Sequence, residues 1–179
     1  MNYKSEDIPW GEVGYATYKR TYARPTKEGS EEWEQTVDRV VEACNKQLGC
    51  DFSVYDQREI KKMMMSLKGT VAGRFLWQLG TKTVDRLGLP SLQNCAFTVV
   101  DEPIRPFTWA FEMLMLGSGV GYNIQREHVY QLPKVRRKVK IENVNDNGAE
   151  FIVPDSREGW TELLKRVLEA SFVTGEAVS

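Results

Sequence analysis

The sequence predicts an α/β fold in which a helical N-terminal part precedes a strand, a helix and a second strand. Apolar residues recur at helical spacing between residues 33 and 67, which is the pattern of amphipathic helices. A short β-rich apolar run begins at Cys95, and an apolar helical stretch and then a second short run follow it. Strand, helix, strand is the βαβ order of an α/β protein.

The composition of the 179 residues is that of a globular protein, with 41% hydrophobic and 27% charged side chains. The formal net charge of -1 argues against a general attraction to nucleic acid or to an anionic membrane. No apolar run approaches the roughly 20 residues of a membrane span, and residues 1–9 are polar and acidic rather than leader-like. We therefore expect a cytoplasmic protein that binds neither nucleic acid nor membrane.

The N-terminal stretch, residues 11–24, is rich in aromatic and basic side chains and is expected to be an arm packed on something larger. A helix is predicted to follow, with Ser30 as its N-cap and an acidic first turn. A full capping box is not expected, because Trp33 stands where Glu or Gln would be needed. The apolar side of this helix is predicted to consist of Trp33, Val37, Val40, Val41 and Cys44.

A second helix is predicted from near Asp56 to about Gly69, and its methionines are expected to fill the core rather than to bind a partner. Residues 73–80 form a short apolar segment with a tryptophan, and residues 81–90 are expected to be a helical or irregular connector. The apolar positions of the second helix are Ile60, Met63, Met64 and Leu67.

Residues 95–100 are apolar and β-rich, which predicts a short strand that is buried on both faces and ends at Asp101. A strongly apolar helix is predicted over residues 107–116, and a second short strand over residues 122–125. The glycine-rich residues 117–121 fit a tight turn or a place where the backbone approaches a ligand phosphate. They lack the strand-to-helix context of a dinucleotide-binding motif.

The polar region after His128 includes the basic residues 134–140 and a turn signal at residues 145–148, which together predict a surface hairpin or loop. Such a basic run is usually a solvated face and less often an anion site. A final helix is predicted to begin at an N-cap formed by Asp155 or Ser156 and to end at Gly175. Its apolar side is predicted to hold Trp160, Leu163, Leu164, Val167, Leu168 and Phe172.

The three cysteines have no zinc-binding spacing and indicate neither a disulfide scaffold nor a closed metal site. Cys44 and Cys50 straddle a helix end, and their separation fits neither a redox CxxC motif nor a metal pair, so both are interpreted as structural. Cys95 heads a predicted buried strand beside the polar Asn94, where a thiol can face a cavity; the alternative is a core-filling cysteine. His128 has no second histidine or obvious carboxylate close in sequence that would make a metal site or a catalytic triad with it, and it is expected at the surface.

A resemblance to a known family rests on segments that occur in one order, namely GYATYKRTYAR, SEEWEQTVDRVVEA, SLQNCAF, GSGVGYNI and VPDSREGW. Together, over residues 11–168, they resemble the N-terminal part of the monomeric, adenosylcobalamin-dependent (class II) ribonucleoside-triphosphate reductases. That family has a ten-stranded α/β barrel in two antiparallel halves, with a finger loop through its centre. The resemblance therefore implies a fragment made of the helical N-terminal layer and the first barrel strands.

The same resemblance implies a division of the chain into three parts. Residues 1–91 are expected to form the N-terminal arm and helical layer, and residues 92–125 the first barrel strands. Residues 126–179 are expected to begin an insertion that houses the effector site.

In the family, the cysteine that matches Cys95 is one of two thiols that deliver two electrons to the ribose and become a disulfide. The glycine segment lies beside the nucleotide. The resemblance thus makes Cys95 the redox-active thiol, and Asn94 and Gly119 the candidate substrate-binding residues, with no metal-ligating residue. The radical-bearing cysteine, the second reducing thiol and the main phosphate loop lie later in the family's sequence, so the isolated chain is expected to be inactive.

The resemblance also implies a cofactor and partners. Adenosylcobalamin is expected to be bound mainly by segments outside this chain. The expected partners are a ribonucleotide substrate, a deoxynucleotide effector, the remaining C-terminal part of the reductase and a thioredoxin-like reductant.

The leading functional prediction is the N-terminal part of an enzyme that converts ribonucleoside triphosphates to deoxyribonucleotides by thiyl-radical chemistry. The alternative is a catalytically silent fragment that keeps a nucleotide-binding or assembly role. A third interpretation, an unrelated α/β binding module, requires the ordered matches to be coincidence. The first two are distinguished by whether a separate chain with the finger-loop cysteine co-purifies.

Overall fold

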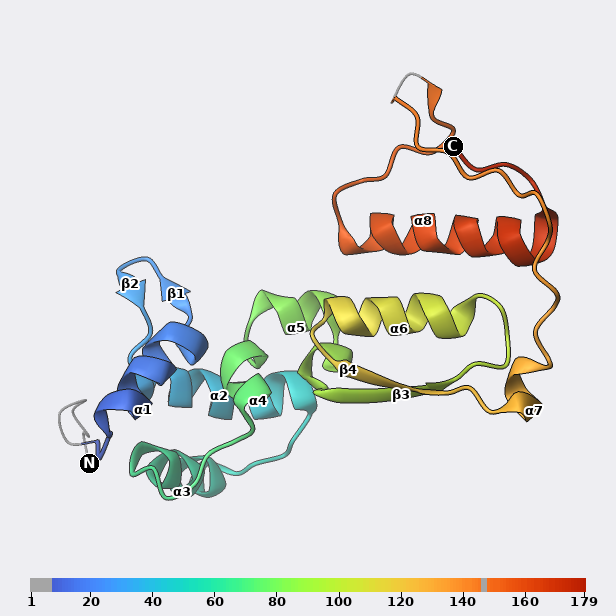
Figure 1. The fold of residues 1–179 in the computed structure, drawn as a ribbon. Helices are drawn as coiled ribbons and strands as arrows, with labels where there is room; N and C mark the ends of the chain where they lie inside the picture. The colour runs from blue at the N-terminus through green and yellow to red at the C-terminus, as the bar shows by residue number, and fades with distance from the viewer. Residues whose placement is uncertain (1–7, 146–147) are drawn as a thin grey trace. The chain divides into compact units, whose positions relative to one another are not determined.

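The computed structural model of the protein describes residues 8–145 and 148–179 (Figure 1). These residues belong to two compact units, the first reaching Gln93 and the second starting at Asn94. Among the described residues, no helix combines the length and the apolar character needed to cross a membrane.

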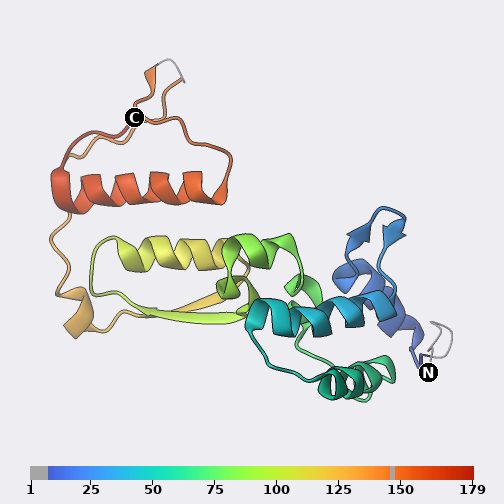
Figure 2. The same ribbon diagram turned by 180° about the vertical axis from the view of Figure 1, so that it is seen from behind.

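The first unit is mostly helical, and one short hairpin interrupts its helices (Figures 1 and 2). In that hairpin β1 and β2 pair antiparallel. The elements of the first unit in chain order are α1 (Glu12–Thr17), the π-helix η2 (Tyr18–Tyr22), β1 (Pro25–Thr26), β2 (Gly29–Ser30), α2 (Trp33–Leu48), α3 (Val54–Met65), α4 (Gly73–Gln78), α5 (Lys82–Leu87) and the 3-10 helix η3 (Leu89–Leu92).

The N-terminal arm is helical and packs on α2 through aromatic rings, which confirms that it lies against a larger body. Trp10 and Tyr18 are stacked with their ring centroids 5.4 Å apart. Trp33, the first residue of α2, meets each of these rings edge-on at 5.2 Å. Its indole N–H donates to the carbonyl oxygen of Met64 at 3.1 Å, which also ties α2 to α3.

The amphipathic pattern of α2 is confirmed, but its N-cap is Glu32 rather than Ser30. Ser30 pairs with Pro25 in the hairpin, so the helix starts only after the hairpin has closed. The backbone N–H of Glu32 donates to Gln35 Oε1 at 2.8 Å as part of a capping box on Glu32, whereas the box predicted to be absent is one on Ser30. The buried apolar residues of α2 are Trp33, Val37, Val40, Val41 and Ala43, with Cys44 partly buried.

The second helix, α3, starts earlier and ends earlier than its apolar spacing suggested. Its N-cap is Ser53, whose hydroxyl accepts from the Asp56 N–H at 3.1 Å, so Asp56 stands in the first turn rather than before it. The helix ends at Met65. Met64 is 1% exposed and fills the core as expected, whereas Met63 is 47% exposed and does not.

The chain after α3 folds into two more short helices, α4 and α5, so the predicted connector is largely helical. Their apolar side chains join a single hydrophobic core with α2 and α3. The buried residues of this core are Ile8, Tyr18, Ala23, Trp33, Val37, Val40, Val41, Ala43, Met64, Met65, Leu76, Leu79, Val84 and Leu92.

A buried polar cluster centred on Glu31 lies at the start of α2. Arg39 Nε donates to Glu31 Oε1 at 2.7 Å, and Arg39 Nη2 donates to Glu31 Oε2 at 2.9 Å. The Thr36 hydroxyl donates to the same carboxylate at 2.7 Å, and the Arg24 N–H donates to it at 3.1 Å. These four hydrogen bonds are all donated to the carboxylate, which is what a buried carboxylate needs to remain ionised.

The guanidinium of Arg39 also ties α2 to the end of α4. It donates to the carbonyl oxygen of Leu76 at 2.9 Å and to that of Leu79. Gly80 follows in the left-handed region, with φ +79°, and a Cβ there would lie 2.5 Å from Arg39 Cγ. The position next to this clamp therefore requires glycine.

The Glu31 cluster predicts a dependence of stability on pH. Burial raises the pKa of Glu31, but the hydrogen bonds from Arg39, Thr36 and Arg24 outweigh it and hold this pKa below its usual range. The resulting stabilisation is present above the unfolded pKa, about 4.3, and is lost as pH falls through the lower folded pKa. We expect the urea midpoint of the chain to fall between about pH 5 and pH 3. The dependence should be weaker in Glu31→Gln, and an equal slope in both proteins would contradict this assignment.

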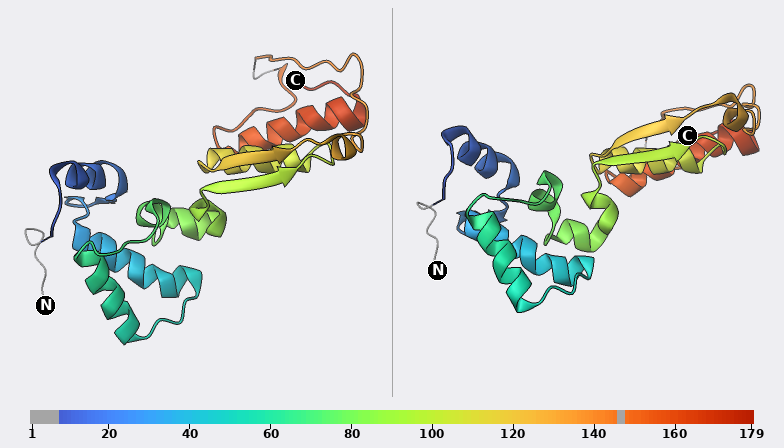
Figure 3. Two further views of the ribbon diagram at one scale, coloured as in Figure 1. Left: turned by 60° about the horizontal axis from the view of Figure 1, so that its bottom comes forward. Right: turned by 90° about the horizontal axis from the view of Figure 1, so that it is seen from below.

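The second unit contains a strand–helix–strand arrangement and a long C-terminal helix. In Figures 1 and 2, α6 lies between the strand pair and α8. Figure 3 shows β3 and β4 side by side and running in the same direction, as their parallel pairing requires. The βαβ prediction is thereby confirmed. The elements of this unit are β3 (Cys95–Val99), α6 (Arg105–Met115), β4 (Gly119–Asn123), α7 (Arg126–Val129), α8 (Arg157–Glu169) and the π-helix η5 (Ala170–Thr174).

Two expectations about the strands are wrong. The second strand begins at Gly119, not at Tyr122, so part of the glycine-rich segment belongs to the strand rather than to a turn. The first strand is not buried on both faces, since Cys95 is exposed and Phe97 is 64% exposed. The reason is that, within the described residues, β3 and β4 form a sheet of two strands that is covered by a helix on one face.

The C-terminal helix α8 starts as predicted, with Ser156 as its N-cap and the Gly159 N–H donating to its hydroxyl at 3.0 Å. It continues through η5 to Gly175, which takes the left-handed conformation with φ +80°. The expected apolar side is only partly buried, and Trp160 on it is 47% exposed.

The basic segment 134–140 does not form a hairpin with residues that follow it directly. Instead the Glu142 N–H donates to the Val178 carbonyl and the Val178 N–H to the Lys140 carbonyl, each at 2.9 Å. Arg136 Nη2 donates to the carbonyl oxygen of Val173 at 2.7 Å, so at least this basic side chain is held against η5. The predicted turn at residues 145–148 includes positions 146 and 147, which lie outside the described residues.

Candidate functional site

The structure brings together the three residues that the sequence singled out. Cys95 is the first residue of β3 and stands opposite Gly119 in the parallel register. The Gly119 N–H donates to the carbonyl oxygen of Asn94 at 2.9 Å, which closes the start of the strand pair. A thiol, an amide side chain and a residue without a side chain therefore share one end of the sheet.

The face of the sheet that carries Cys95 is open above the backbone of β4. Side chains alternate along a strand, so Cys95 and Phe97 point to the same face as their partners Gly119 and Gly121. A Cβ at Gly121 would lie 3.0 Å from the Phe97 ring, whereas a Cβ at Gly119 would have no atom nearer than 3.9 Å. Gly121 accommodates the phenyl ring, and Gly119 leaves free space beside the thiol.

The described residues do not enclose Cys95 in a cavity, contrary to the expectation of a buried strand end. Its side chain is exposed. A groove of about 470 Å³ runs along the outer side of β3 and the start of α6, but Cys95 does not line it. The residues that line this groove are Phe97, Thr98, Val99, Asp101, Arg105, Pro106 and Trp109.

No metal-binding constellation accompanies the thiol. Within residues 8–145 and 148–179, no group of three or more His, Cys, Asp or Glu side chains is arranged to hold a metal ion. His128 lies 3.6 Å from Glu127 through Nε2, and its side chain is 26% exposed, so it is partly buried rather than a plain surface residue. Cys44 and Cys50 belong to the first unit, at the end of α2, where the sequence placed them.

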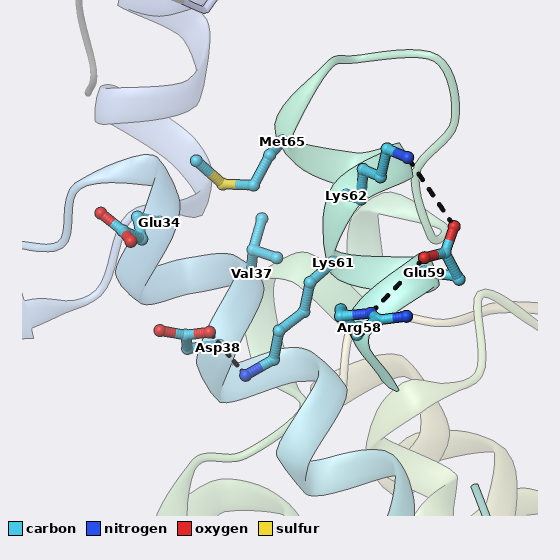
Figure 4. A pocket seen from close by; sticks show the side chains of 8 residues that line it. All are labelled: Glu34, Val37, Asp38, Arg58, Glu59, Lys61, Lys62 and Met65. Atoms are coloured by element: carbon cyan, nitrogen blue, oxygen red, sulfur yellow. Dashed lines mark ion pairs between the residues drawn. The ribbon is translucent and has the colours of Figure 1, made fainter. Parts of the chain in front are cut away.

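Sequence reasoning did not identify the groove of about 470 Å³ between α2 and α3 (Figure 4). Its floor is apolar at Val37 and Met65, and its rim carries charges of both signs. Lys61 Nζ lies 2.6 Å from Asp38 Oδ1 across the groove. Because these charges come from two helices and neutralise each other, the linear sequence contains no run that would indicate the groove.

The open face of the second unit predicts binding of an apolar dye. Phe97 on this face is 64% exposed, and exposed apolar surface of this kind binds anilinonaphthalene sulfonate. We expect dye fluorescence to rise with the native chain, and Phe97→Ser to reduce that rise by about half. The matched control is Val13→Ser, since Val13 is 80% exposed in the first unit. Equal effects of the two substitutions, or no fluorescence rise at all, would argue against an apolar binding face at β3.

Comparison with known proteins finds similarity to ribonucleotide reductases. A family model described as the ribonucleotide reductase alpha domain matches residues 1–81. The adenosylcobalamin-dependent ribonucleoside-triphosphate reductase of Lactobacillus helveticus is 29% identical over 222 residues, covering 91% of this chain and 30% of that protein. The enzyme of the same name from Lactobacillus delbrueckii subsp. bulgaricus is 32% identical over 206 residues, covering 84% of this chain and 28% of that protein.

A solved structure supports the same relationship. The crystal structure of a B-12 dependent (class II) ribonucleotide reductase is similar with a TM-score of 0.73 and 29% sequence identity, covering 92% of this chain and 30% of that chain. The chain thus spans about 30% of the length of the relatives that it matches. The alignment of 222 residues is longer than the 179 residues of the chain, so that relative has residues with no counterpart here.

Proposed function

Since the chain is related to the adenosylcobalamin-dependent ribonucleoside-triphosphate reductases and matches their N-terminal region, we propose that it supplies the N-terminal part of such an enzyme. The proposed reaction converts ribonucleoside triphosphates to 2'-deoxyribonucleotides by thiyl-radical chemistry. The observation that carries the proposal is the position of Cys95 at the start of β3, opposite Gly119, which has no side chain. The segment around Cys95 resembles the family segment that contains a reducing cysteine.

Cys95 is assigned the role of reductant. In the proposed step its thiol and a second thiol, supplied from outside this chain, together give two electrons and two protons to the activated ribose. The 2'-hydroxyl leaves as water, a C–H bond forms at C2', and the two sulfur atoms join in a disulfide. The exposure of Cys95 in this chain leaves it accessible to that second thiol and to the sugar.

Asn94 and Gly119 are assigned to substrate positioning. The N–H of Gly119 is already used by the Asn94 carbonyl, so the contribution of Gly119 is the space left by its missing side chain rather than a hydrogen bond to the substrate. Asn94 directly precedes β3 at the same strand end, and we assign its side-chain amide to contact with the sugar. Rigid placement of the ribose against the thiol is the kind of positioning that accelerates a bound reaction.

A pair of glycine substitutions tests this division of roles. Gly119→Ala introduces no contact closer than 3.9 Å and should leave the stability of the chain unchanged. In the complete enzyme it should raise KM by about tenfold, because the new methyl group occupies the proposed substrate space. Gly121→Ala meets the Phe97 ring at 3.0 Å and should instead lower stability. If Gly119→Ala leaves KM unchanged, the substrate does not approach this backbone.

Adenosylcobalamin, when bound, supplies the initiating radical in enzymes of this kind. The described residues do not fit it well, because the grooves beside α2 and β3 are open and lined by charged side chains such as Arg58 and Arg105. We therefore assign the contacts of adenosylcobalamin to other segments of the enzyme.

We also propose a division of the chain into three parts. Residues 1–91 form the helical layer, residues 92–125 the first barrel strands, and residues 126–179 the start of the effector-binding insertion. The proposed partners are a deoxynucleotide effector and a thioredoxin-like reductant.

The test is a reductase assay with adenosylcobalamin and a dithiol, on the 179-residue chain with and without the remaining C-terminal polypeptide. We expect no deoxynucleotide from the chain alone and product formation from the combination. Steady product from the chain alone would contradict the proposed division of labour. If the two polypeptides associate but form no product, the chain has an assembly role without catalysis.

A further inference from the structure

The C-terminal end of α2 holds two cysteines close together. The helix ends at Leu48, and Gly49 takes the left-handed conformation with φ +69°, which turns the chain back on the helix. As a result the backbone N–H of Cys50 donates to the carbonyl oxygen of Cys44 at 3.0 Å. The turn at Gly49 thus brings Cys50 close to Cys44, although their spacing in the sequence matches no redox motif.

A second set of contacts holds the returning segment in place. The side-chain amide of Asn45 donates to the Phe52 carbonyl at 2.9 Å, and its oxygen accepts from the Phe52 N–H at 3.1 Å. Gln57 Nε2 also donates to the Phe52 carbonyl, at 3.1 Å. Hydrogen bonds to Cys44 and Asn45 therefore hold residues 50–52 against the last turn of α2.

The backbone geometry is compatible with a disulfide. A direct hydrogen bond of 3.0 Å from the Cys50 nitrogen to the Cys44 carbonyl oxygen, with covalent bonds of about 1.2–1.5 Å at either end, keeps the two Cα atoms within roughly 7 Å of each other. Disulfides usually join Cα atoms that are about 4.4–6.8 Å apart. Both cysteines are free and partly exposed, so the thiols can be reached by a small reagent.

The environment of Cys44 changes the pKa of its thiol. Burial raises the pKa of Cys44, and the neighbouring Cys50 raises it further. A raised pKa leaves a smaller fraction of Cys44 as the thiolate, which makes Cys44 a poorer first nucleophile. The first attack on an external reagent then falls to Cys50, and Cys44 is placed to react with whatever forms on Cys50.

We propose that Cys44 and Cys50 form a reversible disulfide by exchange with a low-molecular-weight disulfide, which makes the end of α2 a redox modification site. The Cys50 thiol loses its proton to solvent, its sulfur attacks the reagent, and the reagent's S–S bond breaks to release one thiol. Cys44 then loses its proton and attacks the Cys50 sulfur of the mixed disulfide, which releases the second thiol. Overall, two protein thiols are oxidised by two electrons and one external disulfide is reduced to two thiols.

The experiment uses oxidised glutathione on the reduced chain at neutral pH, followed by alkylation and mass spectrometry. We expect Cys44 and Cys50 to escape alkylation because they are joined to each other, while Cys95 is linked to neither of them. Trypsin cuts after Lys46, between the two cysteines, so peptides 40–46 and 47–58 should stay linked until a reductant separates them. Linkage that involves Cys95, or stable glutathione adducts without linkage, would overturn the proposal.

Variants separate the roles of the two thiols. Cys44→Ser should accumulate a stable glutathione adduct on Cys50, and Cys50→Ser should leave Cys44 largely unmodified. Cys95→Ser is the matched control and should form the linked peptides as the natural chain does. The same oxidation in concentrated urea shows whether the fold is responsible. If unfolding does not lower the ratio of linked peptide to glutathione adduct, the fold does not bring the thiols together and the proposal fails.

Discussion

Replacement of Cys95 by serine is expected to abolish deoxynucleotide formation by the complete enzyme while leaving the chain folded. The hydroxyl is close in size to the thiol but cannot be oxidised to a disulfide by the sugar intermediate. We expect product formation to fall by roughly a thousandfold or more, as it does when a group that takes part in the chemistry is removed. Because Cys95 is exposed in this chain, the free energy of unfolding should change by no more than about 0.5 kcal/mol.

The measurement pairs product, by chromatography, with the paramagnetic signal that accompanies radical initiation. In the proposed mechanism Cys95 supplies electrons after the radical has formed, so the signal should persist while product is lost. Urea denaturation of the 179-residue chain supplies the stability control. Near-normal multiple turnover by Cys95→Ser would remove this residue from the mechanism. Loss of both the signal and the product would place it in radical initiation instead.

Replacement of Arg39 by alanine is expected to destabilise the first unit by about 3–5 kcal/mol. The guanidinium lies 2.7 Å from Glu31, and the two side chains are only 14% and 9% exposed. Its removal leaves a buried carboxylate without its main partner and frees the carbonyl groups at the end of α4. Breaking one side of a buried ion pair is costly because the remaining charge is desolvated and unpaired.

The matched control for Arg39→Ala is Lys46→Ala on the same helix. Lys46 lies 3.2 Å from Glu42, and these side chains are 74% and 50% exposed. An exposed pair of this kind contributes about 0.5 kcal/mol or less, because water and salt screen it. Urea denaturation followed by circular dichroism gives both values. Similar losses for the two variants would show that the Glu31 cluster is not the clamp described above.

The helices of the first unit illustrate what local pattern can and cannot predict. The apolar spacing of α2 identified its buried side correctly, because helical periodicity is a property of consecutive residues. The prediction of Ser30 as the N-cap is wrong, because Ser30 pairs with Pro25 in a hairpin that the sequence analysis did not predict. The start of α3 differs for a related reason: the sequence predicts that the helix begins near Asp56, whereas in the structure Asp56 completes a capping box on Ser53.

The candidate site also combines features that the sequence predicted with one that it did not. The residues Cys95, Asn94 and Gly119 were named from the sequence and its resemblance to a family, and the parallel register of β3 and β4 sets them together. The prediction that Cys95 is buried is wrong. An apolar, β-rich run shows only that a strand can pack against other elements. Whether it is covered depends on neighbours that lie elsewhere in the sequence.

The amino-acid sequence alone predicts the βαβ order and the apolar side of α2, because both arise from patterns within a few consecutive residues. Tertiary structure decided the rest: the clamp of Arg39 on Glu31, the exposure of Cys95 and the approach of Cys50 to Cys44. Each of these depends on where the chain returns to itself, which follows from turn conformations and from packing between distant segments. Such contacts leave no periodic trace in the sequence, because the free energy that selects them comes from the whole packed unit.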